Sequence, residues 1–265
     1  MWRPQNERTR CSPGMWRLLT SVIAIAWAMY PGSARSAIHP EAQLLDPVAW
    51  SVDLGLAMRQ GWVPPFRGAQ RDRSMTNLGG SWRPSETVEL DASWGWLSDT
   101  RMAGDPISGP GDVRLGFTTE HRFGGLELAG GWSVKLPNAQ DEGELGSDET
   151  DVQLIGTIGH RWEKLAVRAS AGMDIRGDPI RFANQDDVAQ VWLSTVGRVG
   201  PLDISGNLGG DLATVRSPAR LSSQAGLRWG ERFHVGAFGG TGLTPAAADW
   251  NAMVQLGWSG VKSPD

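Results

Sequence analysis

Charged side chains recur at alternate positions through much of this chain, and this spacing is its first indication of chemistry. In the segment 112–136, most acidic and basic residues share one face with each other, and most large apolar residues share the opposite face. Successive side chains of a β-strand point to opposite sides, so such a strand has one charged and one apolar face. Charged faces that together enclose a space would line a polar path and select solutes by charge. The candidates for this lining are Glu89, Asp91, Asp112, Arg114, Glu120, Arg122, Glu127, Lys135, Arg168, Asp203 and Arg228.

The same charges have a simpler interpretation, which the residue types leave open. Acidic and basic side chains on neighbouring strands can pair with one another, and the resulting network would narrow or close the enclosed space. The chain has no nucleotide-binding loop. Neither a cofactor nor an energy source is therefore implied, and movement through such a path would be passive.

Residues for enzymatic chemistry are sparse. Ser205, Ser222 and Ser223 are candidate hydroxyls inside the enclosed space, but none lies in a recognisable nucleophile motif. His234 is expected on the charged face, and no Ser/His/acid set at motif spacing accompanies it. The acidic stretches 141–144 and 148–151 lack the ligand spacing of a dedicated calcium loop. We predict no catalytic residue, no metal site and no bound cofactor.

The alternation of polar and apolar residues predicts a series of twelve antiparallel strands. Short turns are expected at 84–85, 124–125, 163–164, 200–201 and 230–231, and longer loops at 61–73, 98–110, 137–150, 176–187, 213–219 and 242–248. Barrels of the bacterial outer membrane have an even number of strands, short periplasmic turns and longer external loops. The expected strands are 50–60, 74–83, 86–97, 111–123, 126–136, 151–162, 165–175, 188–199, 202–212, 220–229, 232–241 and 249–258.

The N-terminal region has the pattern of a secretory leader. An apolar run at 18–29 follows Arg17 and precedes small residues at 31–37, and it is too short for a comfortable membrane-spanning helix. We predict a signal peptide over 1–37, with Met15 as an alternative start and a permanent N-terminal anchor as the alternative interpretation. Cys11 is the only cysteine and lies in this leader. The mature chain would then contain neither a disulfide nor a thiolate metal site.

Aromatic residues fall close to the ends of the expected strands. Tryptophan and its relatives prefer the headgroup level of a membrane, so a barrel carries one aromatic band at each interface. One band is expected beside the short turns and comprises Trp50, Trp82, Phe123, Trp162, Trp229, Phe233 and Trp258. The other is expected near the long loops and comprises Trp62, Trp96, Trp192 and Trp250.

These features predict an all-β protein whose residues 38–265 form one transmembrane antiparallel barrel of about twelve strands. We expect export across the inner membrane, insertion by the assembly machinery of the outer membrane, and contact with outer-membrane lipid in a Gram-negative bacterium. The formal net charge is −4 and no basic stretch is present, so a nucleic-acid partner is not expected. A passive channel for a small solute is the favoured function. A non-transporting structural or adhesion barrel and an outer-membrane lipid hydrolase are the alternatives.

Short motifs in the middle of the chain add a resemblance to a known family. They are Gly109-Pro-Gly-Asp-Val113, Val134-Lys-Leu-Pro137, Leu145-Gly-Ser147 and Thr150-Asp151. This pattern resembles the MetA-pathway of phenol degradation, or transporter-like, family of bacterial outer-membrane proteins. The likeness covers about 109–175, and it departs from the family where Asn138-Ala139 stand in place of Thr-Gly. It implies passive movement of small, often hydrophobic or aromatic, compounds across the outer membrane.

The assigned faces lead to a direct expectation for two neighbouring residues. Leu128 should face lipid and Glu127 should face the enclosed space. Leu128→Arg is therefore expected to destabilise the barrel far more than Glu127→Arg.

Overall fold

The computed structural model describes residues 49–62, 71–101, 106–138, 150–176, 186–214 and 218–260. Every element in these ranges is a strand. No helix that is long and apolar enough to cross a membrane occurs among the described residues. The predicted leader at 1–37, with Cys11, lies outside them.

Thirteen strands follow one another along the chain. They are β1 (Trp50–Trp62), β2 (Arg71–Trp82), β3 (Val88–Arg101), β4 (Ile107–Pro110), β5 (Val113–Phe123), β6 (Leu126–Leu136), β7 (Asp151–Arg161), β8 (Leu165–Arg176), β9 (Asp186–Val199), β10 (Leu202–Asp211), β11 (Arg220–Trp229), β12 (Phe233–Gly242) and β13 (Trp250–Gly260).

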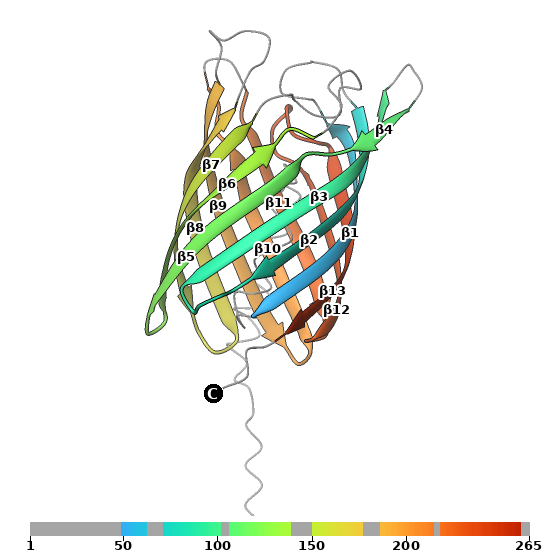
Figure 1. Cartoon of the computed structure of the whole chain (residues 1–265). Helices are drawn as coiled ribbons and strands as arrows, with labels where there is room; N and C mark the ends of the chain where they lie inside the picture. The colour runs from blue at the N-terminus through green and yellow to red at the C-terminus, as the bar shows by residue number, and fades with distance from the viewer. Residues whose placement is uncertain are drawn as a thin grey trace, which may run out of the picture.

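The strands close into a barrel because the first pairs with the last. β1 pairs antiparallel with β2 on one side and with β13 on the other. From β5 to β13 each strand pairs with the next, and β3 bridges β2 and β5. Of the thirteen strands β4 pairs only with β3, which leaves twelve in the ring. Figure 1 shows these strands tilted around a common axis. The predicted twelve-stranded antiparallel barrel is confirmed.

The two ends of the barrel differ. Connections at 83–87, 124–125, 162–164, 200–201 and 230–232 are short, and we call this the turn end. The opposite end, which we call the loop end, carries the longer connections (Figure 1). Gly124 and Gly200 have φ angles of 62° and 61°, which glycine adopts without steric cost. The predicted alternation of short and long connections is thus present.

Each strand separates two kinds of surface. Leu54 on the outer face is 45% exposed, whereas its neighbour Asp53 on the inner face is 4% exposed. The same alternation continues around the ring, so large exposed apolar side chains gather on the outside and polar side chains on the inside. Soluble proteins rarely expose so extensive an apolar surface, whereas a membrane barrel requires one.

One element was not predicted. The segment 98–110 was expected to be a loop, but β3 continues to Arg101, and β4 pairs with the part of β3 that is nearer the loop end. β5 pairs with the lower part of β3, so β4 and β5 together resemble one strand interrupted at Gly111 and Asp112. The Gly111 amide donates a hydrogen bond to the Gly95 carbonyl at 2.7 Å. A Cβ on Gly111 would lie 3.2 Å from that oxygen, so the interruption favours glycine. Four residues are too few for alternation to reveal a strand.

Candidate functional site

The predicted lining residues share the inner face of the barrel. The β-ladder register places those within strands on inward positions of β3, β5, β6, β8, β10 and β11, and Asp112 immediately precedes β5. The residues concerned are Glu89, Asp91, Asp112, Arg114, Glu120, Arg122, Glu127, Lys135, Arg168, Asp203 and Arg228. Most of them belong to three groups of contacts, of which two lie near the turn end and one near the loop end.

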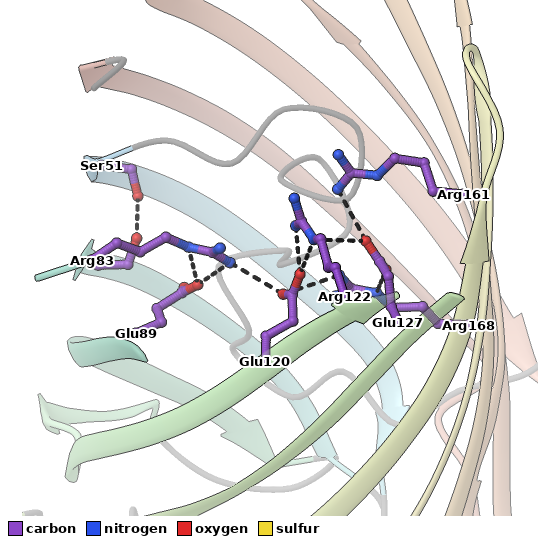
Figure 2. Close-up of polar contacts among 9 residues, drawn as sticks. Ser51, Arg83, Glu89, Glu120, Arg122, Glu127, Arg161 and Arg168 are labelled. Carbon is purple, nitrogen blue, oxygen red and sulfur yellow. Dashed lines mark hydrogen bonds and ion pairs between the residues drawn. The ribbon is translucent and has the colours of Figure 1, made fainter. Parts of the chain in front are cut away.

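The first group, the turn-end cluster, is built on two buried glutamates (Figure 2). Glu120 contacts three arginines: Arg122 is the nearest, Arg168 lies at 3.4 Å and Arg83 lies at 3.6 Å. Glu127 lies 2.9 Å from Arg168, 3.1 Å from Arg161 and 3.3 Å from Arg122. Arg83 also reaches Glu89 at 2.5 Å. Shared carboxylates of this kind fix several guanidinium groups at once.

A glycine lies beneath the central contact of this cluster. Glu127 on β6 and Arg168 on β8 meet across the intervening strand β7, directly above Gly159. A Cβ on Gly159 would come within 2.7 Å of the Arg168 side chain. Glycine at this position therefore lets two strands that are not neighbours exchange a charged contact.

The second group is centred on His234. Its Nε2 lies 2.8 Å from the Asp53 carboxylate and its Nδ1 lies 3.1 Å from the Arg228 guanidinium. Gln255 donates to the same Asp53 oxygen at 2.8 Å. Gly257 separates Asp53 from His234, and a Cβ there would lie about 2 Å from both side chains, at 2.0 and 2.1 Å. Arg198 pairs with Asp203 at 2.7 Å, and Asp203 is the cross-strand partner of Arg228.

The third group lies toward the loop end. Lys135 sits between two carboxylates, at 2.7 Å from Asp151 and 3.6 Å from Asp112. Arg73 and Asp99 form a two-point ion pair at 2.6 and 2.7 Å. A chain of buried hydrogen bonds runs from Gln153 to Gln190 and from Gln190 to Asp211. Arg176 then pairs with both Asp211 and Asp174.

Three lumenal charges differ from these groups. Asp91, Arg114 and Arg59 make no hydrogen bond or ion pair with any other residue that the structure describes. The charges of Arg73 and Arg114 repel Arg59, and Asp99 attracts it. Unlike the shared arginines of the turn-end cluster, these side chains keep their hydrogen-bonding capacity for a solute.

The predicted interface aromatics lie on the outer face. All nine are exposed by more than a third of their surface, namely Trp50, Trp82, Trp96, Phe123, Trp162, Trp229, Phe233, Trp250 and Trp258. Trp50 and Trp258 meet edge to face with centroids 5.7 Å apart. The Trp250 indole donates to the Gln60 side chain at the loop end.

Trp192 does not join the outer band. Its position on β9 has the same parity as the inward Gln190, and it pairs with inward Gly209 of β10. The prediction of an interfacial role for Trp192 was therefore wrong. The inward positions of β9 mix apolar with polar residues, which obscures the parity of this strand. The side chain of Trp62 lies outside the described residues.

Sequence reasoning missed several members of the lumen. Asp53 has a clear signal, because β1 alternates cleanly from Ser51 onward, but this strand carries only two charges, Asp53 and Arg59, which are too few to define a charged face. Arg73 and Asp99 fell outside the strand limits predicted for β2 and β3. Arg83 is the last residue of its predicted strand, and the pairing of β3 with both β2 and β5 brings it to Glu120.

The arrangement offers little to an enzyme. Both ring nitrogens of His234 are engaged, so this histidine has no nitrogen left to activate a hydroxyl. Ser222 and Ser223 are adjacent on β11 and point to opposite faces, so they cannot both be lumenal as predicted. Among the described residues, no group of histidine, cysteine, aspartate and glutamate is arranged to hold a metal ion. The acidic stretch at 141–144 lies outside these residues.

The chain has the fold of an outer-membrane β-barrel. Its structure is similar to the COG4313 outer membrane channel from Pseudomonas putida F1, with a TM-score of 0.63, 15% identity, and coverage of 85% of this chain and 100% of that one. It is also similar to the translocator domain of the autotransporter NalP from Neisseria meningitidis, with a TM-score of 0.56, 13% identity, and coverage of 92% and 97%. For the KdgM porin the TM-score is 0.53 at 10% identity, with coverage of 79% and 98%.

No family model and no curated protein matches the chain. The resemblance to the MetA-pathway family thus remains a prediction.

Proposed function

We propose that this protein is a passive channel of the outer membrane for small, mainly hydrophobic or aromatic, solutes. One observation carries the proposal: a closed ring of strands holds ionised side chains inside and large apolar side chains outside. Such a wall is stable only with lipid around it and polar contents within it. The fold that it shares with a channel and a porin supports the same function.

The size and chemistry of the lumen favour small solutes with an apolar part. A ring of twelve strands is not wide, and ion-paired side chains project into its interior (Figure 2). Trp192 and Phe238 are aromatic residues on inward positions, which an aqueous pore for ions alone does not need. The resemblance of 109–175 to the transporter-like family points to the same solute class.

The proposal includes the cellular setting. We infer that the leader at 1–37 directs export, that the assembly machinery inserts the barrel, and that outer-membrane lipid contacts its outer face. The short turns would then lie in the periplasm and the long loops outside the cell.

Swelling of proteoliposomes tests both the channel and its preference. Methanesulfonate and benzenesulfonate carry the same permanent charge, so neither crosses lipid unaided. A channel that only sieves by size passes the smaller methanesulfonate faster. We expect benzenesulfonate to enter at least as fast. Swelling with neither salt would contradict the channel, and faster entry of methanesulfonate in proportion to its size would contradict the aromatic preference.

A further inference from the structure

The β-ladder register defines one continuous line of uncharged side chains around the lumen, which we call the apolar row. Each member is the direct cross-strand partner of the next, from β8 through β13 to β3. Its members, in spatial order, are Ala166, Val196, Ser205, Gly226, Phe238, Met253, Ala57, Met75 and Leu97.

This row climbs through the barrel. Ala166 lies beside the short connection 162–164 at the turn end, and Leu97 lies in the upper part of β3 near the loop end. A line of cross-strand partners runs perpendicular to the strands, so in a barrel of tilted strands it rises as it goes around. The apolar row therefore connects the two ends of the lumen.

The lumenal rows on either side of it differ in chemistry. On each strand, the next inward position toward the turn end lies two residues from the apolar row. From β12 to β3 these positions form a row of glycines and amides, namely Gly236, Gln255, Gly55, Asn77 and Gly95. Two residues toward the loop end, the partners are Gly240, Asn251, Arg59, Arg73 and Asp99, which include charges. A solute on the apolar row thus has small and amide residues on its turn-end side and charged residues, mainly arginines, on its loop-end side.

The middle of the row combines an aromatic ring with two methionines. The Phe238 ring lies over Gly226 and Gly236, where a Cβ would come within 2.1 and 2.7 Å of its carbons. Met253 and Met75 flank Ala57 and are only partly buried. Methionine is flexible and polarisable, so it adapts to apolar ligands of different shape.

Arg59 provides an anion partner beside this apolar surface. It follows Ala57 by two residues on the same face of β1, a separation of roughly 7 Å. It makes no ion pair or hydrogen bond with any described residue, and Arg73 and Arg114 add positive charge nearby against the single carboxylate of Asp99. A small ring and one carboxylate span the separation between Ala57 and Arg59.

We propose that the apolar row and Arg59 together bind a small aromatic or aliphatic monocarboxylate as it passes through the lumen. Its hydrocarbon part contacts Met253, Ala57 and Met75, and its carboxylate accepts hydrogen bonds from the Arg59 guanidinium. This inference rests on the proposed channel function and narrows its solute class to amphipathic anions.

Block of the potassium chloride current through wild-type protein in planar bilayers tests the proposal without a variant. Benzoate has both the ring and the charge, benzamide lacks the charge, and acetate lacks the ring. Loss of a charge-assisted hydrogen bond or of ring burial each costs about tenfold in affinity. We expect the half-blocking concentration of benzoate to be at least about tenfold below that of either analogue.

Two variants then assign the two parts of the solute to their contacts. Arg59→Gln should raise the half-blocking concentration of benzoate about tenfold and leave that of benzamide within about twofold. Met253→Gln should raise both. Arg114→Gln is the control for charge alone, because Arg114 adds positive charge near Arg59 but lies neither on the apolar row nor on the row beside it, and its cross-strand neighbours are Ser93 and Lys135. It should change benzoate block by less than about threefold.

The outcomes separate the two proposals. Equal block by benzoate, benzamide and acetate in a conducting barrel would overturn the amphipathic-anion site and leave the channel intact. If Arg59→Gln and Arg114→Gln raised the half-blocking concentration of benzoate equally, Arg59 would act only through its charge. That result would overturn its role as the hydrogen-bond donor to the carboxylate. Absence of both current and proteoliposome swelling from heat-modifiable, folded protein would overturn the channel itself.

Discussion

Neighbouring residues on one strand of this barrel face two different media, so the same substitution meets a different environment at adjacent positions. Leu128 is 41% exposed on the outer face, and Glu127 is 2% exposed inside. Glu127 contacts three arginines, so Glu127→Arg would place a fourth cation among them. The expectation that Glu127→Arg is mild must therefore be revised. Leu128 also lies only three residues beyond the turn at 124–125, where a long cation can reach the headgroups.

Leu154 and Ile155 on β7 make a better matched pair. Both are aliphatic, and they lie farther from the ends of the strand, on the outer and inner face respectively. Leu154→Arg should cost about 2–4 kcal/mol, because it places a charge in hydrocarbon. Ile155→Arg should cost less, because its guanidinium enters the polar lumen. Urea titrations of both variants in lipid vesicles measure the difference, and equal costs would contradict the assigned faces.

Gly257 tests whether contacts across an intervening strand stabilise the wall. Gly257→Ala should break the contact between Asp53 and His234 and cost about 1–3 kcal/mol, since its Cβ would overlap both side chains. Gly130→Ala on β6 is the control, because nothing lies within 4 Å of a Cβ there. That change should be neutral or slightly stabilising. Equal unfolding free energies for the two variants would show that the contact has no net value.

At the scale of elements, the turn between β5 and β6 depends on a left-handed residue. Gly124 has a φ angle of 62°, and a side chain there would meet nothing within 4 Å. The cost of replacing it is thus conformational. Gly124→Val should lower the free energy of unfolding by about 1–2 kcal/mol. Gly124→Asn should lower it by less, because asparagine tolerates this conformation. A valine variant as stable as the asparagine variant would argue for a different turn.

Alternation predicted the elements well where each face has a uniform environment. β1, β6 and β8 have apolar residues on one parity and polar or small residues on the other. β9 was harder, because Val188, Trp192 and Val196 face the lumen beside Gln190 and Arg198. Contacts such as Asp53 with His234 could not be predicted, since they join segments far apart in sequence and require the closed register. The candidate lining was predictable as a face, but its pairing was not.

For the molecule as a whole, the two faces predict which tryptophans meet lipid. Trp132 is 46% exposed on the outside, and Trp192 points into the lumen. Two variants that retain only one of these tryptophans, in vesicles with brominated acyl chains, should differ in fluorescence. The bromines should strongly quench Trp132 and leave Trp192 nearly unchanged. Equal quenching of both would contradict either the orientation of β9 or the membrane position of the barrel.

The pairing of β1 with β13 has a consequence for how the protein is made. Trp50 is the partner of Gly260, so the seam joins the first and last described strands. Until β13 arrives, β1 and its growing sheet present open edges that can pair with another copy of the chain. Hairpins between neighbouring strands cannot close the barrel. The pairing of β1 with β13, which joins segments far apart in sequence, must form before the hydrogen-bonding groups of both edges are paired. Barrel closure therefore follows synthesis of the last described strand, and both edges of the sheet stay open until then.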